Sequence, residues 1–157
     1  MKSLDRRALL LGLVVLWGCG GKQPANVAVP ADAAVLEALA PCAPTHKLDD
    51  QGRVVELHLE NKAVTDEALD QVRALSELRT LSLYGSAVTD AGLAKLAEMH
   101  RLESLGLGKT CITQKGLKYV EKIRGLRWLW LTSSNALPAS AVDKLKQARP
   151  GLTVYVQ

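Results

Sequence analysis

Aromatic side chains are scarce in this chain of 157 residues: they make up 4% of it, and phenylalanine is absent. Hydrophobic residues nevertheless account for 48%, so the core has to be assembled from leucine, valine, isoleucine and alanine. This composition excludes a sandwich filled with rings and favours a fold that stacks one small apolar position many times. The length supports one domain, because an ordinary domain takes about 100 to 150 residues.

A long hydrophobic run is also missing near the amino terminus. Residues 8–17 are apolar, but as a helix they cover about 15 Å, half of the hydrocarbon core of about 30 Å. Three cationic residues precede the run, which is the layout of a secretory signal peptide. No Ala-x-Ala cleavage site follows; residues 16–19, Leu-Trp-Gly-Cys, resemble the lipobox of bacterial lipoproteins. Trp17 departs from the small residue usual there, so an ordinary signal peptide with a chance cysteine is the alternative.

The lipobox resemblance implies lipidation at Cys19: the thiol is diacylated, the signal peptide (residues 1–18) is removed, and acyl chains hold the protein on a membrane. Two or more chains, at about 0.8 kcal/mol per buried methylene, make this attachment stable. Gly20 stands where an aspartate tends to retain such proteins at the inner membrane. We therefore expect a cell-envelope protein, with the outer membrane favoured, facing the periplasm or the surface. Arg6 and Arg7 leave twin-arginine export open beside the general secretory route.

Charge is distributed unevenly along the chain. Residues 19–100 carry seven cationic and twelve anionic side chains, a net charge of −5, whereas residues 101–157 carry ten and three, a net charge of +7. Such asymmetry can orient a partner or hold one end against an anionic surface. It supports an alternative function, a structural envelope protein that adheres to anionic lipid or wall polymer through its basic carboxyl-terminal half. The simplest interpretation is a set of solvated faces.

The rest of the chain divides by composition. Residues 19–30, rich in Gly, Pro and Ala, are predicted to form a flexible tether. Residues 31–53 are expected to form an amino-terminal cap, with Asp32 as the N-cap of a helix over residues 33–40 and a turn at residues 49–52.

From Val54 onward the sequence repeats every 24 residues. Each unit opens with LxxLxL, or with valine in the first position, and alternation in this opening is strand-like. Apolar residues three apart later in the unit are helix-like. One strand and one helix bury no core alone, so the units have to stack. The units begin at Val54, Leu78, Leu102 and Leu126, and the last is two residues longer.

The repeat opening and the T-D-x-G-L segment after it resemble the ribonuclease-inhibitor-like and cysteine-containing subclass of leucine-rich repeats. The resemblance covers residues 54–157 and implies an α/β fold, a leucine-rich-repeat solenoid with parallel β-strands on the concave side and helices on the convex side. Residues 152–156, shaped like one more strand, would close the last unit and place Tyr155 next to Trp130.

The segment between strand and helix suggests how each unit turns. Thr65, Thr89 and Thr113 are expected N-caps, and Asp66 and Asp90 place carboxylates at the positive ends of their helices. The ninth residue of a unit is expected to bond the backbone of the turn. Lysine cannot accept, so the first unit should be irregular there; the four residues are Lys62, Ser86, Thr110 and Ser134.

Alternate strand residues should face the open, concave side of the sheet, where a partner could bind. Small residues in the third unit predict a trough there, and two tryptophans rise beside it. Rigid aromatic side chains carry much interface energy, so we predict a monomeric protein-binding or peptide-binding module. In the alternative, the tryptophans seal the end of the solenoid. The predicted partner-binding residues are Trp128, Trp130, Tyr84, Tyr155, Ser82, His58, Glu56 and Glu60.

Catalytic and cofactor motifs are missing from the sequence: it has no P-loop, Rossmann glycine pattern, zinc spacing or supported Ser/His/Asp set. We therefore expect no enzyme, no cofactor and, for an exported protein, no nucleic-acid partner. Glu56, His58 and Glu60 could hold a metal only with bent side chains, because alternate strand residues lie about 6.5 Å apart; we expect none. Cys42 and Cys111 should be too far apart for a disulfide and are expected to be small buried thiols.

Overall fold

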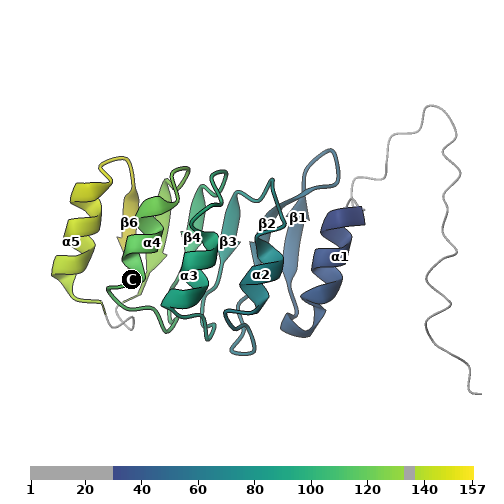
Figure 1. Ribbon diagram of the computed structural model, residues 1–157, viewed down its shortest axis with the longest axis horizontal. Coiled ribbons are helices and arrows are strands. Elements are labelled where there is room, and N and C mark those ends of the chain that lie inside the picture. The colour runs from purple at the N-terminus through teal and green to yellow at the C-terminus, as the bar shows by residue number, and fades with distance from the viewer. Residues whose placement is uncertain (1–29, 133–136) are drawn as a thin grey trace, which may run out of the picture.

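The computed structural model describes residues 30–132 and 137–157; the expected signal peptide, the tether and Cys19 lie outside them, as does Ser134. The described chain is α/β, with one six-stranded sheet in the order β1-β2-β3-β4-β5-β6. Figure 1 shows the helices side by side across one face of this sheet. None of the helices in these ranges combines the length and apolar content needed to cross a membrane. The strands are β1 (Thr45–Leu48), β2 (Val54–His58), β3 (Thr80–Ser82), β4 (Ser104–Gly106), β5 (Trp128–Leu131) and β6 (Thr153–Val156).

Helices alternate with the strands from β2 onward, and each one packs against the next along the row. They are α1 (Pro30–Ala38), α2 (Ala68–Val72), α3 (Asp90–Leu96), α4 (Leu117–Lys122) and α5 (Ala139–Ala148), with a short 3-10 turn over Ala40–Cys42. The helix expected over residues 33–40 therefore begins three residues earlier and ends sooner.

The strand register follows the 24-residue period of the sequence. Strands β2 to β6 are parallel, and Leu57 lies opposite Leu81, which lies opposite Leu105 and then Leu129. Each of these four leucines is at most 1% exposed. Burying one leucine side chain contributes about 1.5 to 3 kcal/mol, and a one-residue slip would turn all of them to the other face. The leucine spacing therefore fixes the register.

Aspartates join one unit to the next on the helix side. Asp66 Oδ1 accepts the Thr89 N–H at 2.8 Å, and its Oδ2 accepts the Thr89 hydroxyl at 2.6 Å. A Cβ on Gly92 would lie 2.3 Å from Asp66 Oδ1, so the glycine makes room for the carboxylate. Asp90 bonds Thr113 at the same two distances, and a Cβ on the next glycine, Gly116, would lie 2.3 Å from it.

The fourth unit lacks this link, and its sequence changes accordingly. Gln114 replaces the aspartate; Pro138, which has no N–H to donate, then stands at the threonine position and Ala141 at the glycine position. In the first unit, which no other unit precedes, Ala68 occupies the glycine position. The carboxylate, the threonine and the glycine thus form one interlocking device, and Asp90 also lies in the first turn of α3, as predicted.

The predicted threonine cap is confirmed in α3, where Thr89 is the N-cap, whereas α4 begins only at Leu117 with Gly116 as its N-cap, so Thr113 does not cap it. Thr89 accepts the Ala91 N–H and Thr113 the Lys115 N–H, both at 3.2 Å. Thr65 instead accepts the Ala68 N–H through its backbone carbonyl at 3.1 Å, and α2 starts only at Ala68.

The ninth position behaves differently in each unit. The buried Thr110 hydroxyl donates to the Leu107 carbonyl at 2.7 Å, as expected for a side chain that ties the turn. Ser86 Oγ is buried without a hydrogen-bond partner among the described residues. In the first unit Lys62 is exposed, and the neighbouring Asn61 side chain accepts the Ala63 N–H at 2.8 Å.

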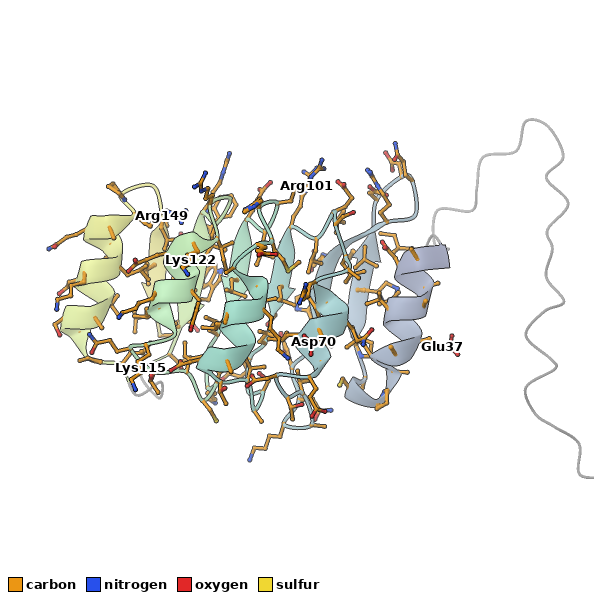
Figure 2. All side chains as sticks on the ribbon, in the orientation of Figure 1. Glu37, Asp70, Arg101, Lys115, Lys122 and Arg149 are labelled. Atoms are coloured by element: carbon orange, nitrogen blue, oxygen red, sulfur yellow. The ribbon has the colours of Figure 1, made fainter. Side chains whose placement is uncertain are left out.

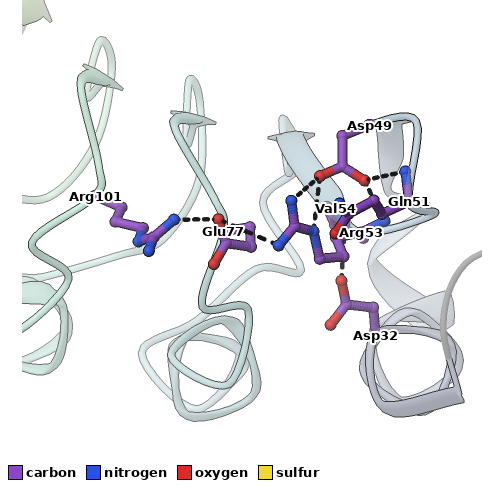
Figure 3. Close-up of polar contacts among 7 residues, drawn as sticks. All are labelled: Asp32, Asp49, Gln51, Arg53, Val54, Glu77 and Arg101. Carbon is purple, nitrogen blue, oxygen red and sulfur yellow. Dashed lines mark hydrogen bonds and ion pairs between the residues drawn. The ribbon is translucent and has the colours of Figure 1, made fainter.

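The amino-terminal edge holds two features that the sequence did not reveal. Strand β1 pairs antiparallel with β2 through a turn in which Gly52 has a φ of 76°. Asp32 does not cap α1: it lies inside the helix, is 8% exposed, and accepts the Val54 N–H at 2.8 Å (Figure 3). The correction has a physical reason, because the buried start of β2 needs an acceptor and Asp32 supplies it.

Ion pairs connect the loops that precede successive strands. Arg53 pairs with Asp49 at 2.6 Å and lies 3.7 Å from Glu77, which also pairs with Arg101 (Figure 3). At the other end, the Arg149 guanidinium donates to carbonyls in the last turn of α4 and in the loop after it. These four bonds, of 2.8 to 3.2 Å, join α5 to the preceding unit. The acceptors belong to Glu121, Ile123, Arg124 and Leu126.

Candidate binding surface

The sheet face opposite the helices carries the residues expected to contact a partner. Parallel register aligns them in rows across the strands, because alternate residues point to the same face. One row contains His58, Ser82, Gly106, Trp130 and Tyr155, and the row before it contains Glu56, Thr80, Ser104, Trp128 and Thr153.

A hollow of about 270 Å³ lies on this face, where the sequence predicted a trough. Gly106 and Gly108 contribute to it from the third unit, and Tyr84 and Trp130 flank them. A Cβ on Gly108 would lie 2.7 Å from both the Tyr84 ring and the Thr132 methyl group, so glycine lets these side chains close in. At Gly106 a Cβ would lie 3.3 Å from Ser82 Oγ, and its absence deepens the hollow.

Aromatic rings border the hollow. Trp130 and Tyr155 stack with their centroids 4.2 Å apart and their planes 15° apart, so the predicted neighbourhood of these two residues is confirmed. Each remains 41% exposed. Lys109 Nζ lies 5.1 Å from the centroid of the Tyr84 ring, within the range of a cation–π contact.

A polar cluster forms the other end of the face, on β2. His58 Nε2 lies 2.7 Å from Glu56 Oε1, and Nδ1 lies 3.3 Å from Glu60 Oε1. Lys47 from β1 reaches Glu56 Oε2 at 2.8 Å, and the Ser82 hydroxyl donates to Glu60 Oε1 at 2.7 Å. The imidazole therefore sits between two carboxylates.

These contacts shift all three acid–base equilibria toward the charged forms. The hydrogen bond to Glu56, aided by Glu60, raises the pKa of His58 above 6.5 against the effect of burial. Lys47, and then His58, lowers the pKa of Glu56 below 4.5. The Ser82 hydroxyl, followed by His58, lowers the pKa of Glu60 below 4.5.

The cluster has neither the arrangement of a metal site nor that of a catalytic triad. Both ring nitrogens of His58 face carboxylates, and no group of three or more His, Cys, Asp or Glu residues within 30–132 and 137–157 could hold a metal ion. The Ser82 hydroxyl donates to Glu60 and not to the imidazole, so the serine and histidine are not paired as in a triad.

Six of the eight predicted partner-binding residues are in or against the hollow. Tyr84, Trp130, Ser82, His58 and Glu60 line it, and Tyr155 packs on Trp130. Trp128 and Glu56 share the face but do not line the hollow. Thr132 and Gln157 also line it; alternation along their strands could have identified both, because each lies two residues beyond a predicted member.

The cysteines are both free, as expected, but one prediction about them is wrong. Cys42 is half-buried, whereas Cys111 is exposed and not a buried thiol. Its backbone N–H donates to the Val88 carbonyl of the unit before, which holds the turn while the side chain points outward.

No protein-family model matches the sequence, and a search of curated proteins finds none that is similar to it. Function therefore has to be inferred from the side chains of this face and their geometry.

Proposed function

We propose that the protein is a lipid-anchored binding module of the bacterial cell envelope. In this proposal Cys19 carries the lipid, and the domain is a leucine-rich-repeat solenoid that holds a protein or peptide partner on its open face. The anchor is supported by the lipobox-like residues 16–19. The solenoid is supported by parallel strands whose paired residues lie 24 apart and by helices confined to one face. The open face would be its concave side.

The observation that carries the binding proposal is the hollow bordered by exposed rings. Trp130 and Tyr155 each leave 41% of their surface to solvent although both lie in a sheet, and an exposed aromatic pair beside a cavity is typical of an interface anchor. A volume of about 270 Å³ lies below the 300 to 1,000 Å³ usual for small-molecule sites. The hollow therefore suits one inserted side chain of a larger partner.

The residues at the two ends of the hollow indicate which chemical groups such a partner would present. The face between β2 and β5 spans three strand spacings, about 14 Å, which an extended segment of about four residues covers. An apolar side chain would pack against Trp130, and a hydrogen-bond donor would reach the 49% exposed Glu60. No cofactor and no catalytic step are part of this proposal.

Photo-crosslinking in the native envelope tests the proposal directly. A photoreactive amino acid replaces Ser82, which lines the hollow, or Lys118, which lies exposed on α4. We expect one discrete crosslinked partner from position 82 and none from position 118. Equal crosslinking from both positions, or none from position 82 in a folded and membrane-bound protein, would contradict binding at this face.

A further inference from the structure

On the helix side, Lys95 of α3 is paired with a carboxylate, whereas the cationic side chains around α4 and α5 are not. Lys95 Nζ contacts Asp70 at 2.7 Å and also the Asp66 carbonyl at 2.7 Å, so the ammonium group of α3 is paired with a carboxylate of α2. Around α4 and α5, six cationic side chains have no carboxylate within 4.0 Å among the described residues. We call them the basic helix face: Lys115, Lys118, Lys122, Arg124, Lys144 and Lys146.

All six side chains of the basic helix face are exposed, because the buried sides of α4 and α5 are formed by apolar residues such as Val120 and Leu145. Two carboxylates, Glu121 and Asp143, share this surface, so it retains a net positive charge. Arg149 is excluded, because its guanidinium is bonded to four backbone carbonyls.

Figure 2 shows how the charges separate along the molecule. Lys115 and Lys122 lie beside α4, whereas Asp70 and Glu37 lie toward the opposite end, beside α2 and α1. The helix side is therefore an electric dipole whose positive end is not neutralised by its own chain. A surface of this kind attracts a broad anionic partner, and the attraction is screened by salt.

We propose that the basic helix face binds the anionic phospholipid headgroups of the membrane to which the chain is anchored. The inference rests on the lipid anchorage proposed above: residues 20–29 extend at most about 35 Å, so the domain always stays within reach of the bilayer. Five of the six cations are lysines, strongly hydrated point charges that suit phosphates spread over a flat surface better than one forked ligand.

The orientation that follows connects the two surfaces of the domain. The helices and the open face are the two sides of one sheet, so a domain lying on its helices turns the hollow toward the aqueous phase. A partner then approaches from solution, and the membrane leaves Trp130 and Tyr155 accessible.

Amine footprinting of the mature lipidated protein tests this orientation. The protein is bound to vesicles of phosphatidylcholine, with or without phosphatidylglycerol, and lysine acylation is measured by mass spectrometry. When phosphatidylglycerol is present, we expect acylation to fall about fivefold at Lys118, Lys122, Lys144 and Lys146. A factor of about five is what one basic residue near an anionic membrane surface contributes to binding. Lys62 and Lys109, in the loops after β2 and β4, serve as references and should not change. High salt should abolish the protection.

Charge reversal provides the matched comparison. The variant Lys118→Glu with Lys122→Glu should lose the protection of Lys144 and Lys146, whereas Lys62→Glu with Arg73→Glu, an equal charge change at exposed positions, should keep it. Protection that persists in the first variant, or that is equal with phosphatidylcholine alone, would overturn the proposal. So would equal protection by soluble polyglutamate, because that result assigns the face to an acidic polymer.

Flotation separates this inference from the anchor. A lipidated protein that floats with phosphatidylcholine vesicles but shows no added protection on phosphatidylglycerol supports the anchor and contradicts the basic helix face. A protein that floats only with anionic vesicles contradicts the anchor and supports the basic helix face.

Discussion

Replacing Gly116 by alanine tests the carboxylate link between units. A helix position usually gains about 0.5 to 1 kcal/mol when glycine becomes alanine. Here the new Cβ would lie 2.3 Å from Asp90 Oδ1, so the carboxylate has to leave. It then loses the Thr113 N–H at 2.8 Å and the Thr113 hydroxyl at 2.6 Å, each a bond to a charged group.

The structure sets the size of the effect. Losing two exposed hydrogen bonds to a carboxylate destabilises the fold by about 2 to 3 kcal/mol, and the helical preference of alanine offsets part of this. We expect Gly116→Ala to lower the free energy of unfolding by about 1 to 2 kcal/mol, and Asp90→Ala by about 2 kcal/mol. In the double variant the clash is gone, so its loss should be no larger than that of Asp90→Ala alone. The coupling energy is then about 1 to 2 kcal/mol.

Urea denaturation, followed by tryptophan fluorescence and circular dichroism, measures all four proteins. The matched control is Ala141→Gly in the fourth unit, where Gln114 replaces the aspartate. Because no carboxylate needs the space there, glycine should destabilise by about 0.5 to 1 kcal/mol. Additive losses at Gly116 and Asp90, or a stabilising Gly116→Ala, would refute the interlocking role of the three residues.

Three further predictions concern other contacts. The pKa of His58, measured by NMR, should exceed 6.5, and the variant Glu56→Gln should lower it most. The stabilising contribution of the His58 contacts should be complete below about pH 6.5 and should be lost as pH rises through the pKa of the folded state. An ordinary or lowered pKa of His58 would contradict the cluster geometry. Arg149→Lys should lower the free energy of unfolding by about 2 kcal/mol, because one ammonium cannot reproduce four carbonyl contacts, and an unchanged urea midpoint would contradict the role of Arg149 in joining α5 to the preceding unit. Leu105→Ala, fully buried in β4, should cost about 2 to 5 kcal/mol, whereas a loss below about 1 kcal/mol would show a loosely packed centre.

The sheet was predictable because leucine spacing carries two signals at once. Period-two alternation marked the strands, and the 24-residue repeat fixed which residues pair, as for Leu81 and Leu105. The final strand was equally visible, since Leu152 and Val154 continue the alternation. Strands alternating with helices followed from these positions, whereas the parallel direction of β2 to β6 was expected from the leucine-rich-repeat resemblance.

Strand β1 was not predictable in the same way. Its four residues bury no face, and three of them are exposed, so no hydrophobic alternation marks it. It forms because the turn at Asp49 and Gly52 folds it back on β2, where main-chain pairing and the ion pair between Lys47 and Glu56 hold it. The role of Asp32 was hidden because its partner, Val54, lies 22 residues away.

The link between units is visible in the sequence as a set of residues that change together. Where Asp66 and Asp90 occur, the next unit has threonine and glycine, and where Gln114 occurs it has Pro138 and Ala141. Composition alone could not say that the carboxylate reaches across, because the same aspartates also suit a helix start.

Alternation placed the candidate site on the correct face but could not orient its rings. Trp128 and Trp130 are equivalent in sequence, and both are about 40% exposed. Strand pairing predicted that Tyr155 lies next to Trp130, but it could not predict that these rings stack at the hollow while Trp128 lies outside it.

That difference provides the most direct measurement of the central claim, that the hollow of the open face binds a partner. Crosslinking yield from position 82 is compared between Trp130→Ala and Trp128→Ala in the native envelope, with circular dichroism to verify folding. Losing a tryptophan anchor typically costs 2 kcal/mol or more, about a thirtyfold loss of affinity. We predict that loss for Trp130→Ala and a change of less than about threefold for Trp128→Ala. Equal losses in both variants, or none in a folded Trp130→Ala, would contradict it.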